Sequence, residues 1–146
     1  METIHTQLYQ LPGGLFLENA PIFISEGSLW QNKETAELFG RLQLKNIDMR
    51  TVQAVAVKLI PFATNGALLG DGVFHTYTPD AEPNGYFGAD ALLPLPENTC
   101  AFGACVTEVT FADGTVWTPE NTRAWHVADE GYNPQAPAPK KKGLFR

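Results

Sequence analysis

Hydrophobic and polar side chains alternate along several stretches of the chain, which is the pattern of half-buried β-strands. The two clearest stretches are Glu37–Ile47 and Gln53–Phe62. In each of them the apolar residues occupy every second position and so share one face of an extended segment. Both stretches are therefore predicted to be strands that pack one face against a core.

The longest alternating stretch is Thr99–Phe111, which begins with both faces largely apolar and is therefore predicted to be a central strand. Strict alternation divides its side chains into two sets: Ala101, Gly103, Cys105, Thr107, Val109 and Phe111 on one face, and Cys100, Phe102, Ala104, Val106 and Glu108 on the other.

Turn signals separate further, shorter segments. Val73–Thr78 and Tyr86–Leu95 are also predicted to be strands, each following a loop rich in glycine, proline or aspartate. Asp113-Gly114 predicts a tight hairpin, because both residue types accept a positive φ in a two-residue turn. Thr118–Asn121 carries the cap residue and the proline that open a short helix.

About seven strands at short spacing favour an all-β domain. We expect an antiparallel β-sandwich of the immunoglobulin or fibronectin III type, with a small closed β-barrel as the alternative. Residues 1–20 are expected to form an extended lead-in, residues 21–130 the sandwich, and residues 131–146 a flexible tail rich in proline and lysine.

A series of short motifs follows one order over roughly residues 20–118. They are Pro21-Ile22-Phe23-Ile24, Gly27-Ser28-Leu29, Leu42-Gln43-Leu44-Lys45-Asn46-Ile47, Val52-Gln53-Ala54-Val55-Ala56-Val57, Tyr86-Phe87-Gly88, and Val109-Thr110-Phe111-Ala112-Asp113-Gly114-Thr115-Val116-Trp117. In this order they resemble a family of uncharacterised bacterial β-sandwich modules, found mostly in Firmicutes. The resemblance implies a fold but no established activity and no catalytic residue. The chain departs from that pattern at Ile60–Ala63, where the family runs into an acidic turn.

The net charge of −6 is unevenly distributed along the 146 residues. The last seven residues hold four basic groups, so residues 1–139 carry the other 6 basic and all 16 acidic groups, a net charge of −10. An acidic body repels phosphate backbones, which argues against binding to nucleic acid. Lys140, Lys141 and Lys142 could make a weak contact with an anionic surface, although a solubilising tail explains them more simply.

Two cysteines, Cys100 and Cys105, fall in one predicted strand at an odd spacing, so a disulfide between them is not expected. Both are predicted to be reduced thiols packed in or against the core. The chain opens without a secretory pattern and contains no apolar run long enough to span a membrane. These observations favour the cytoplasm.

The residues that could bind a metal or catalyse a reaction lie far apart in the sequence or have simpler structural explanations. His5, His75 and His126 lack the spacing of metal ligands, and Cys105 has apolar neighbours that disfavour a nucleophilic thiolate. No metal or cofactor is predicted. Carboxylates occur in two regions of the sequence: Asp80, Glu82 and Asp90 in one, and Asp113, Glu120 and Asp129 in the other. A Ca²⁺ site formed by Asp71 and loop carbonyls is conceivable, but the sequence contains no loop of the EF-hand type.

Aromatic residues are the best candidates for a contact surface, because exposed rings anchor partners at little cost in entropy. They are Trp30, Tyr86, Phe87 and Trp125, whereas Trp117 is expected to pack in the core. The favoured hypothesis is a non-catalytic module that binds another protein or a second copy of itself. The alternatives are a carbohydrate-binding module that stacks sugars on these rings, and a hydrolase that uses a pair of carboxylates.

Overall fold

A computed structural model describes residues 4–119 and 125–127 and shows an all-β protein. No helix occurs among these residues, and the strands form two antiparallel sheets that do not close into a barrel. The strands are β1 His5–Gln10, β2 Leu15–Phe16, β3 Ile22–Asn32, β4 Leu38–Asn46, β5 Val52–Phe62, β6 Val73–Tyr77, β7 Tyr86–Phe87, β8 Leu93–Leu95, β9 Ala101–Phe111, β10 Val116–Trp117 and β11 His126–Val127. The predicted β-sandwich is confirmed, with more strands than the seven expected.

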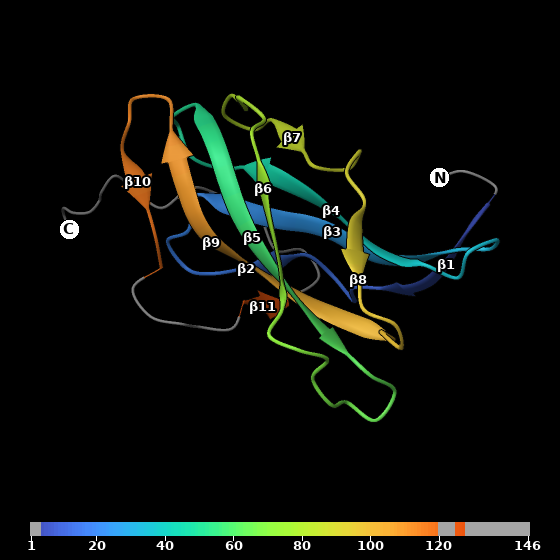
Figure 1. Ribbon diagram of the computed structural model, residues 1–146. Helices are drawn as coiled ribbons and strands as arrows, with labels where there is room; N and C mark the ends of the chain where they lie inside the picture. The colour runs from blue at the N-terminus through green and yellow to red at the C-terminus, as the bar shows by residue number, and fades with distance from the viewer. Residues whose placement is uncertain (1–3, 120–124, 128–146) are drawn as a thin grey trace.

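The two sheets lie one in front of the other (Figure 1). The larger sheet has the order β11-β2-β3-β4-β7, with β1 beside β3 and β8 beside β4, and the smaller has the order β10-β9-β5-β6. Their inner faces supply the fully buried side chains of the core: Ile22, Ile24, Leu29, Leu42 and Leu44 from the larger sheet, and Val52, Val55, Val57, Leu59, Phe102, Val106 and Phe111 from the smaller. The driving force for the fold is therefore the burial of these two apolar faces against each other.

The alternation predicted for β4 and β5 is confirmed, because every second residue is buried along β4 and along β5 from Val55 onward. β9 lies between β10 and β5, so it is central as predicted, but its alternation is interrupted. Glu108 faces Ala56 and Val106 faces Val57, which leaves Thr107 as an extra residue in the ladder. This β-bulge changes the phase of the strand. The inward set is consequently Phe102, Ala104, Val106, Val109 and Phe111, and the two faces assigned by strict alternation were wrong.

Two segments differ from their predicted form. Residues 1–20 do more than lead into the domain, because β1 and β2 both pair with β3. Tyr86–Leu95 is two short strands, β7 and β8, separated by a loop in which Gly88 has a φ of +95°. Gly88 packs so closely on the core that a Cβ there would lie 2.8 Å from Leu44 Cδ1, so the positive φ and the packing both require glycine.

The hairpin between β9 and β10 is confirmed, but Gly114 is its one residue with a positive φ, at +91°. Asp113 instead accepts a hydrogen bond from the Thr115 amide. Thr118 and Pro119 are not helical, and the rest of the predicted helix lies outside the described residues. So do the predicted tail over 131–146 and its Lys140, Lys141 and Lys142.

Both cysteines are free thiols, but their surroundings differ. Cys105 is half-buried against the core, and this burial raises its pKa. Cys100 is exposed, 2.9 Å from the Thr64 hydroxyl, so the prediction that it packs against the core was wrong. It directly precedes β9 and lies outside the inward face of that strand. Within the described ranges, the protein has no helix with the length and apolar character to cross a membrane.

Candidate functional site

The smaller sheet ends at β6, an edge strand with an uncharged sequence of high β-propensity. Its ladder with β5 runs from Val73 to Tyr77 without a bulge. Among the described residues, β5 is the only strand that pairs with it. Phe74 projects from the outer face of this strand and is 65% exposed. No described strand pairs with the outer side of β6, although β8 of the other sheet lies close to it, and a large exposed aromatic ring stands beside this edge.

A shallow groove of about 510 Å³ begins where β6 ends. It is lined by residues 77–79, which finish β6 and follow it, and by residues 86–90, which form β7 and the loop after it. The groove therefore lies between the edges of the two sheets. Its volume is in the range of sites that accept a small ligand or a few residues of a peptide.

Tyr77 lines this groove with a ring that is almost fully buried. The ring makes edge-to-face contacts with His75 and Phe87, at centroid distances of 4.5 Å and 5.9 Å. The Tyr77 hydroxyl has no hydrogen-bond partner among the described residues. Burial, together with the negative charge of Asp90, raises the pKa of Tyr77 to about 12. The hydroxyl is therefore protonated at neutral pH and is a buried donor that lacks an acceptor.

The opposite wall of the groove carries its one charged lining residue, Asp90, which is exposed. Tyr86 on the same wall is 58% exposed, and the Lys45 ammonium lies 5.4 Å from the centroid of its ring. Arg41 holds this wall in place by donating a hydrogen bond from Nε to the Ala89 carbonyl. The groove combines an aromatic surface, a buried hydroxyl and a single negative charge.

The four predicted contact aromatics are divided by the structure. Tyr86 and the half-buried Phe87 meet at the groove. Trp30 is half-buried elsewhere, with its indole N–H donating to the Ser28 hydroxyl. Trp125 is 9% exposed and belongs to the core, so its assignment to a contact surface was wrong. Trp125 lies far along the sequence from the alternating segments, so the sequence pattern does not indicate that the chain packs against the sandwich again at this residue. Trp117 packs against the core, as expected.

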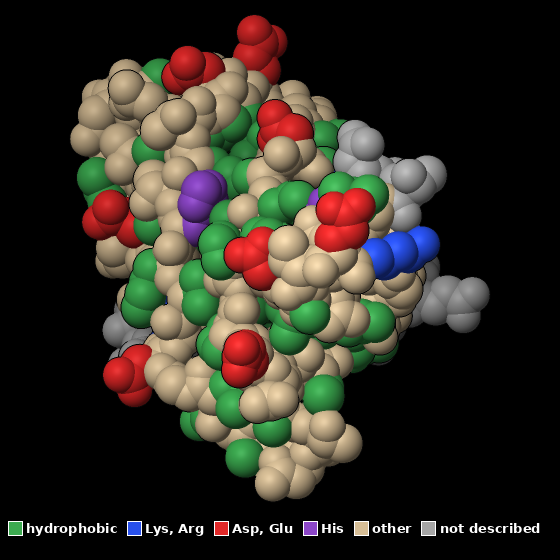
Figure 2. All heavy atoms as spheres, turned by 45° about the vertical axis from the view of Figure 1, so that its right-hand side comes forward, with side chains coloured by type: hydrophobic (Ala, Val, Ile, Leu, Met, Phe, Trp, Pro, Cys, Tyr) green, Lys and Arg blue, Asp and Glu red, His purple; other side chains and the backbone are tan. Residues whose placement is uncertain are grey.

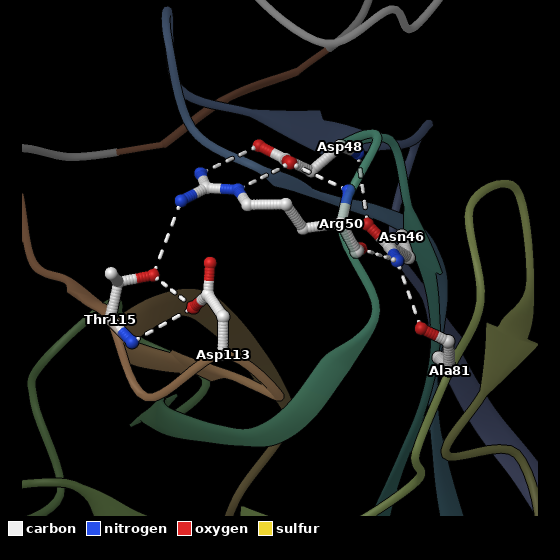
Figure 3. Close-up of polar contacts among 6 residues, drawn as sticks. All are labelled: Asn46, Asp48, Arg50, Ala81, Asp113 and Thr115. Atoms are coloured by element: carbon white, nitrogen blue, oxygen red, sulfur yellow. Dashed lines mark hydrogen bonds and ion pairs between the residues drawn. The ribbon is translucent and has the colours of Figure 1, made fainter.

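A second polar feature surrounds Asn46, the last residue of β4 (Figure 3). Asn46 is fully buried, and its Nδ2 donates to the carbonyls of Arg50 at 2.9 Å and Ala81 at 3.0 Å. Its Oδ1 accepts a hydrogen bond of 2.9 Å from the Asp48 amide. One side chain thus joins the end of β4, the β4–β5 loop and the segment between β6 and β7.

Arg50 extends this cluster to the β9–β10 hairpin (Figure 3). Its guanidinium donates to both carboxylate oxygens of Asp48, at 2.9 Å and 3.1 Å, and to the Thr115 hydroxyl at 3.3 Å. It also stacks 3.6 Å from the centroid of Phe111. Partial burial acts to raise the pKa of Asp48, but the hydrogen bonds and charge of Arg50 outweigh it, and the net result is a lowered pKa. Hydrogen bonds from Thr115 lower the pKa of Asp113 as well.

The remaining predicted chemistry does not assemble. Across residues 4–119 and 125–127, no group of three or more metal-ligating side chains comes together. His75 lies on the edge strand, as predicted, and His5 packs edge-to-face on Phe39 at 6.0 Å. Asp80 and Glu82 are exposed in the loop after β6 and do not line the groove. The side chain of His126 and the residues Glu120 and Asp129 lie outside the described residues.

Sequence reasoning missed three residues that define these features. Phe74 and Tyr77 were seen only as parts of a strand, although the absence of charge and proline in that strand was a signal of an unprotected edge. Asn46 enters the sequence analysis only as part of the motif that ends at Ile47. The signal for its role was Asn46-x-Asp48-x-Arg50, a spacing at which side-chain oxygens bind amides two residues further on.

Comparison with known proteins finds no similar protein: no family model, no curated protein and no solved structure matches this chain. The resemblance to bacterial sandwich modules therefore stays a prediction from the motifs. Acidic side chains are spread over the face shown in Figure 2, whereas basic side chains are visible mainly at its right-hand margin. The surface that a partner meets on this face is predominantly neutral or negative.

Proposed function

We propose that this protein is a non-catalytic interaction module that binds an extended polypeptide segment by strand addition to the outer edge of β6. The observation that carries this proposal is the outer edge of β6, with which no described strand pairs. A bare edge strand presents a row of backbone donors and acceptors, and proteins commonly use such edges to bind a partner as an additional strand. Phe74, beside this edge, offers apolar area that a partner would cover.

The other edges of the described sheets carry features that discourage pairing. The ladder of β1 is interrupted between Gln7 and Tyr9, and β8 contains Pro94. β7, β10 and β11 are each two residues long. Bulges, proline and short length are the devices by which natural sheets protect their edges. β6 has none of them.

A contact function also agrees with the composition of the groove beside β6. Its described lining has one carboxylate and contains neither histidine nor thiol, so it lacks the pair of groups that general acid–base hydrolysis uses. The two unpaired cysteines support a reducing compartment, which is the basis for proposing a cytoplasmic protein. The partner is another protein or a second copy of this chain.

The test uses the full chain and a displayed library of random linear peptides. Selected peptides are added to the protein, and amide hydrogen exchange is measured residue by residue. We expect slower exchange within Val73–Tyr77, because a new strand would protect those amides. Phe74→Lys is expected to weaken binding by about tenfold, because it places a charge beside the edge. Val116→Lys is the matched control, since Val116 is also exposed but lies on the opposite edge.

Protection confined to β10 or to the loops, or a failure to select any peptide, would contradict the proposal. Sedimentation over a range of concentrations addresses self-association. A dimer that protects the same β6 amides would support strand addition with a second copy as the partner. A dimer that leaves those amides unprotected would count against it.

A further inference from the structure

We infer that the groove at the end of β6 selects the partner, and that it receives a lysine or arginine side chain from the added segment. This inference rests on strand addition at β6 and specifies which polypeptides would bind there. It assigns a role to Tyr77, Tyr86 and Asp90.

The position of the groove gives the first argument. Tyr77 ends β6 and lines the groove, and residues 78 and 79 continue from the strand into that lining. A strand advances about 3.3 Å per residue. A segment paired along Val73–Tyr77 that continues by two or three residues therefore enters the groove without changing direction. Its side chains there lie between the end of β6 and the β7 loop.

Charge gives the second argument. Asp90 is in the groove, Asp80 and Glu82 lie in the loop between β6 and β7, and Asp71 precedes β6. Three cations lie nearby, and none of them is among the described lining residues of the groove: Arg41 donates to the Ala89 carbonyl, Lys58 lies 5.6 Å from the Phe74 ring and Lys45 lies 5.4 Å from the Tyr86 ring. Four acidic groups against three basic ones, with Asp90 as the charged group in the described lining, favour a cationic segment.

The Tyr77 hydroxyl gives an independent argument that something binds. It is one of two buried polar side-chain atoms without a partner among the described residues. A buried donor without an acceptor costs about 1–3 kcal/mol, which a newly supplied acceptor recovers. A polypeptide carries a carbonyl acceptor at every residue. The hydroxyl is closed to solvent in the unbound protein, so this pairing requires the side chains around it to shift.

Tyr86 completes the recognition of a cation. Its ring is exposed at the groove, and aromatic faces attract ammonium and guanidinium groups. A guanidinium can stack on the ring and pair with the Asp90 carboxylate at the same time, because it is planar and has several donors. Arginine is therefore expected to bind more tightly than lysine, and both more tightly than an uncharged residue.

The test compares blocked synthetic peptides that differ at one position. Each has the sequence Thr-X-Thr-Val-Thr-Val-Thr, where X is arginine, lysine, glutamine or glutamate and lies beyond Tyr77 when the peptide pairs antiparallel with β6. Affinity for the full chain is measured by calorimetry. We expect the arginine peptide to bind about tenfold more tightly than the glutamine peptide, and the glutamate peptide to bind most weakly. The preference for arginine is expected to shrink as salt is added.

Asp90→Asn is expected to abolish the difference between arginine and glutamine peptides and to leave the affinity of the glutamine peptide unchanged. Asp90 is exposed, so the variant retains the fold, which an amide spectrum would verify. Asp71→Asn is the matched control, because it removes an exposed carboxylate outside the groove and should leave the arginine preference intact.

The outcomes separate the two proposals. If peptides protect the β6 amides but show no arginine preference, or keep it in Asp90→Asn, the groove inference is overturned and strand addition stands. If no peptide protects β6, both are overturned. Binding of a neutral oligosaccharide such as maltohexaose, lost in Tyr86→Ala, with no peptide binding, would also overturn both and favour sugar recognition.

Discussion

The cluster around Asn46 and the groove around Tyr77 both place polar atoms inside an apolar sandwich, but they differ in how those atoms are paired. In the side-chain amide of Asn46, both the NH2 group and the carbonyl oxygen form hydrogen bonds. The Arg50 guanidinium bonds to the side chains of Asp48 and Thr115. At the groove, the Tyr77 hydroxyl is unpaired among the described residues, and the neighbouring edge of β6 has no partner strand there.

This difference separates structural polarity from polarity that is available to a ligand. A fully paired cluster stabilises the loops that it joins and offers nothing to an incoming group. An unpaired donor costs stability in the unbound protein and can recover that cost only when something binds. The two regions are connected, because Asn46 also binds the Ala81 carbonyl in the segment between β6 and the groove loop. The cluster around Asn46 therefore holds in place the segment that follows β6, on one side of the groove around Tyr77.

The largest expected effect is on the paired region. Asn46→Ala removes three hydrogen bonds made by a fully buried side chain, to the Arg50 and Ala81 carbonyls and from the Asp48 amide, while the Ala81 carbonyl keeps its bond from the Val52 amide. We expect the free energy of unfolding, measured by urea denaturation, to fall by about 3–5 kcal/mol. Asn65→Ala is the control, because Asn65 is exposed and accepts one amide hydrogen bond in a turn, and it should cost less than about 1 kcal/mol. Equal losses in both variants would refute the structural role of Asn46.

A smaller effect is expected from acid. Folding lowers the pKa of Asp48 below its usual value, so the resulting stability is fully present above about pH 4. It is lost as the pH falls through the lowered pKa of the folded state. Between pH 5 and pH 2.5, we expect the wild type to lose about 1 kcal/mol more free energy of unfolding than Asp48→Asn.

Asp71→Asn supplies the comparison for that measurement, because it removes an exposed carboxylate from the β5–β6 loop. Its acid dependence should parallel that of the wild type. If Asp48→Asn also parallels the wild type, the ion pair with Arg50 makes no contribution to stability.

The smallest effect, and one of opposite sign, is expected at Tyr77. Tyr77→Phe removes a hydroxyl that has no partner among the described residues, so the free energy of unfolding should stay constant or rise by up to about 1–2 kcal/mol. In the wild type the folded pKa is raised to about 12, above the unfolded value near 10, so stability is present below pH 10 and is lost as the pH rises toward 12. Tyr77→Phe should lack this alkaline loss.

Tyr86→Phe is the control at alkaline pH, because Tyr86 is exposed and its replacement should leave the alkaline loss in place. A destabilisation of about 2 kcal/mol or more in Tyr77→Phe would show that the hydroxyl is hydrogen-bonded after all, and would remove one support of the groove inference.

The sandwich itself was predictable, because burial of one face imposes period two on β4 and β5 and the sequence displays it. The phase of β9 was not predictable by the same rule. A bulge adds one residue without changing composition, so the alternation on either side of Thr107 is regular but out of step. Apolar periodicity gives the strands and does not give the local register.

The groove was half predictable. Tyr86 and Phe87 are identified from the sequence as contact residues because exposed aromatic rings anchor partners at little cost in entropy. Tyr77 and Asp90 reach the same place through pairing of β6 with β5 and of β7 with β4, contacts between residues far apart in the chain. Trp125 was misassigned for the same reason, because a two-residue strand that pairs with β2 follows it directly.

The extra residue in β9 has a consequence for insertions and deletions. Removing one residue between Val106 and Val109 would restore regular alternation and keep all five inward side chains of β9 on their face. Removing a residue at Gly103 or Cys105 would instead turn part of that apolar set toward solvent. A shortened descendant of this chain could therefore lose a residue at the bulge and retain the sandwich, whereas the rest of β9 must keep its length.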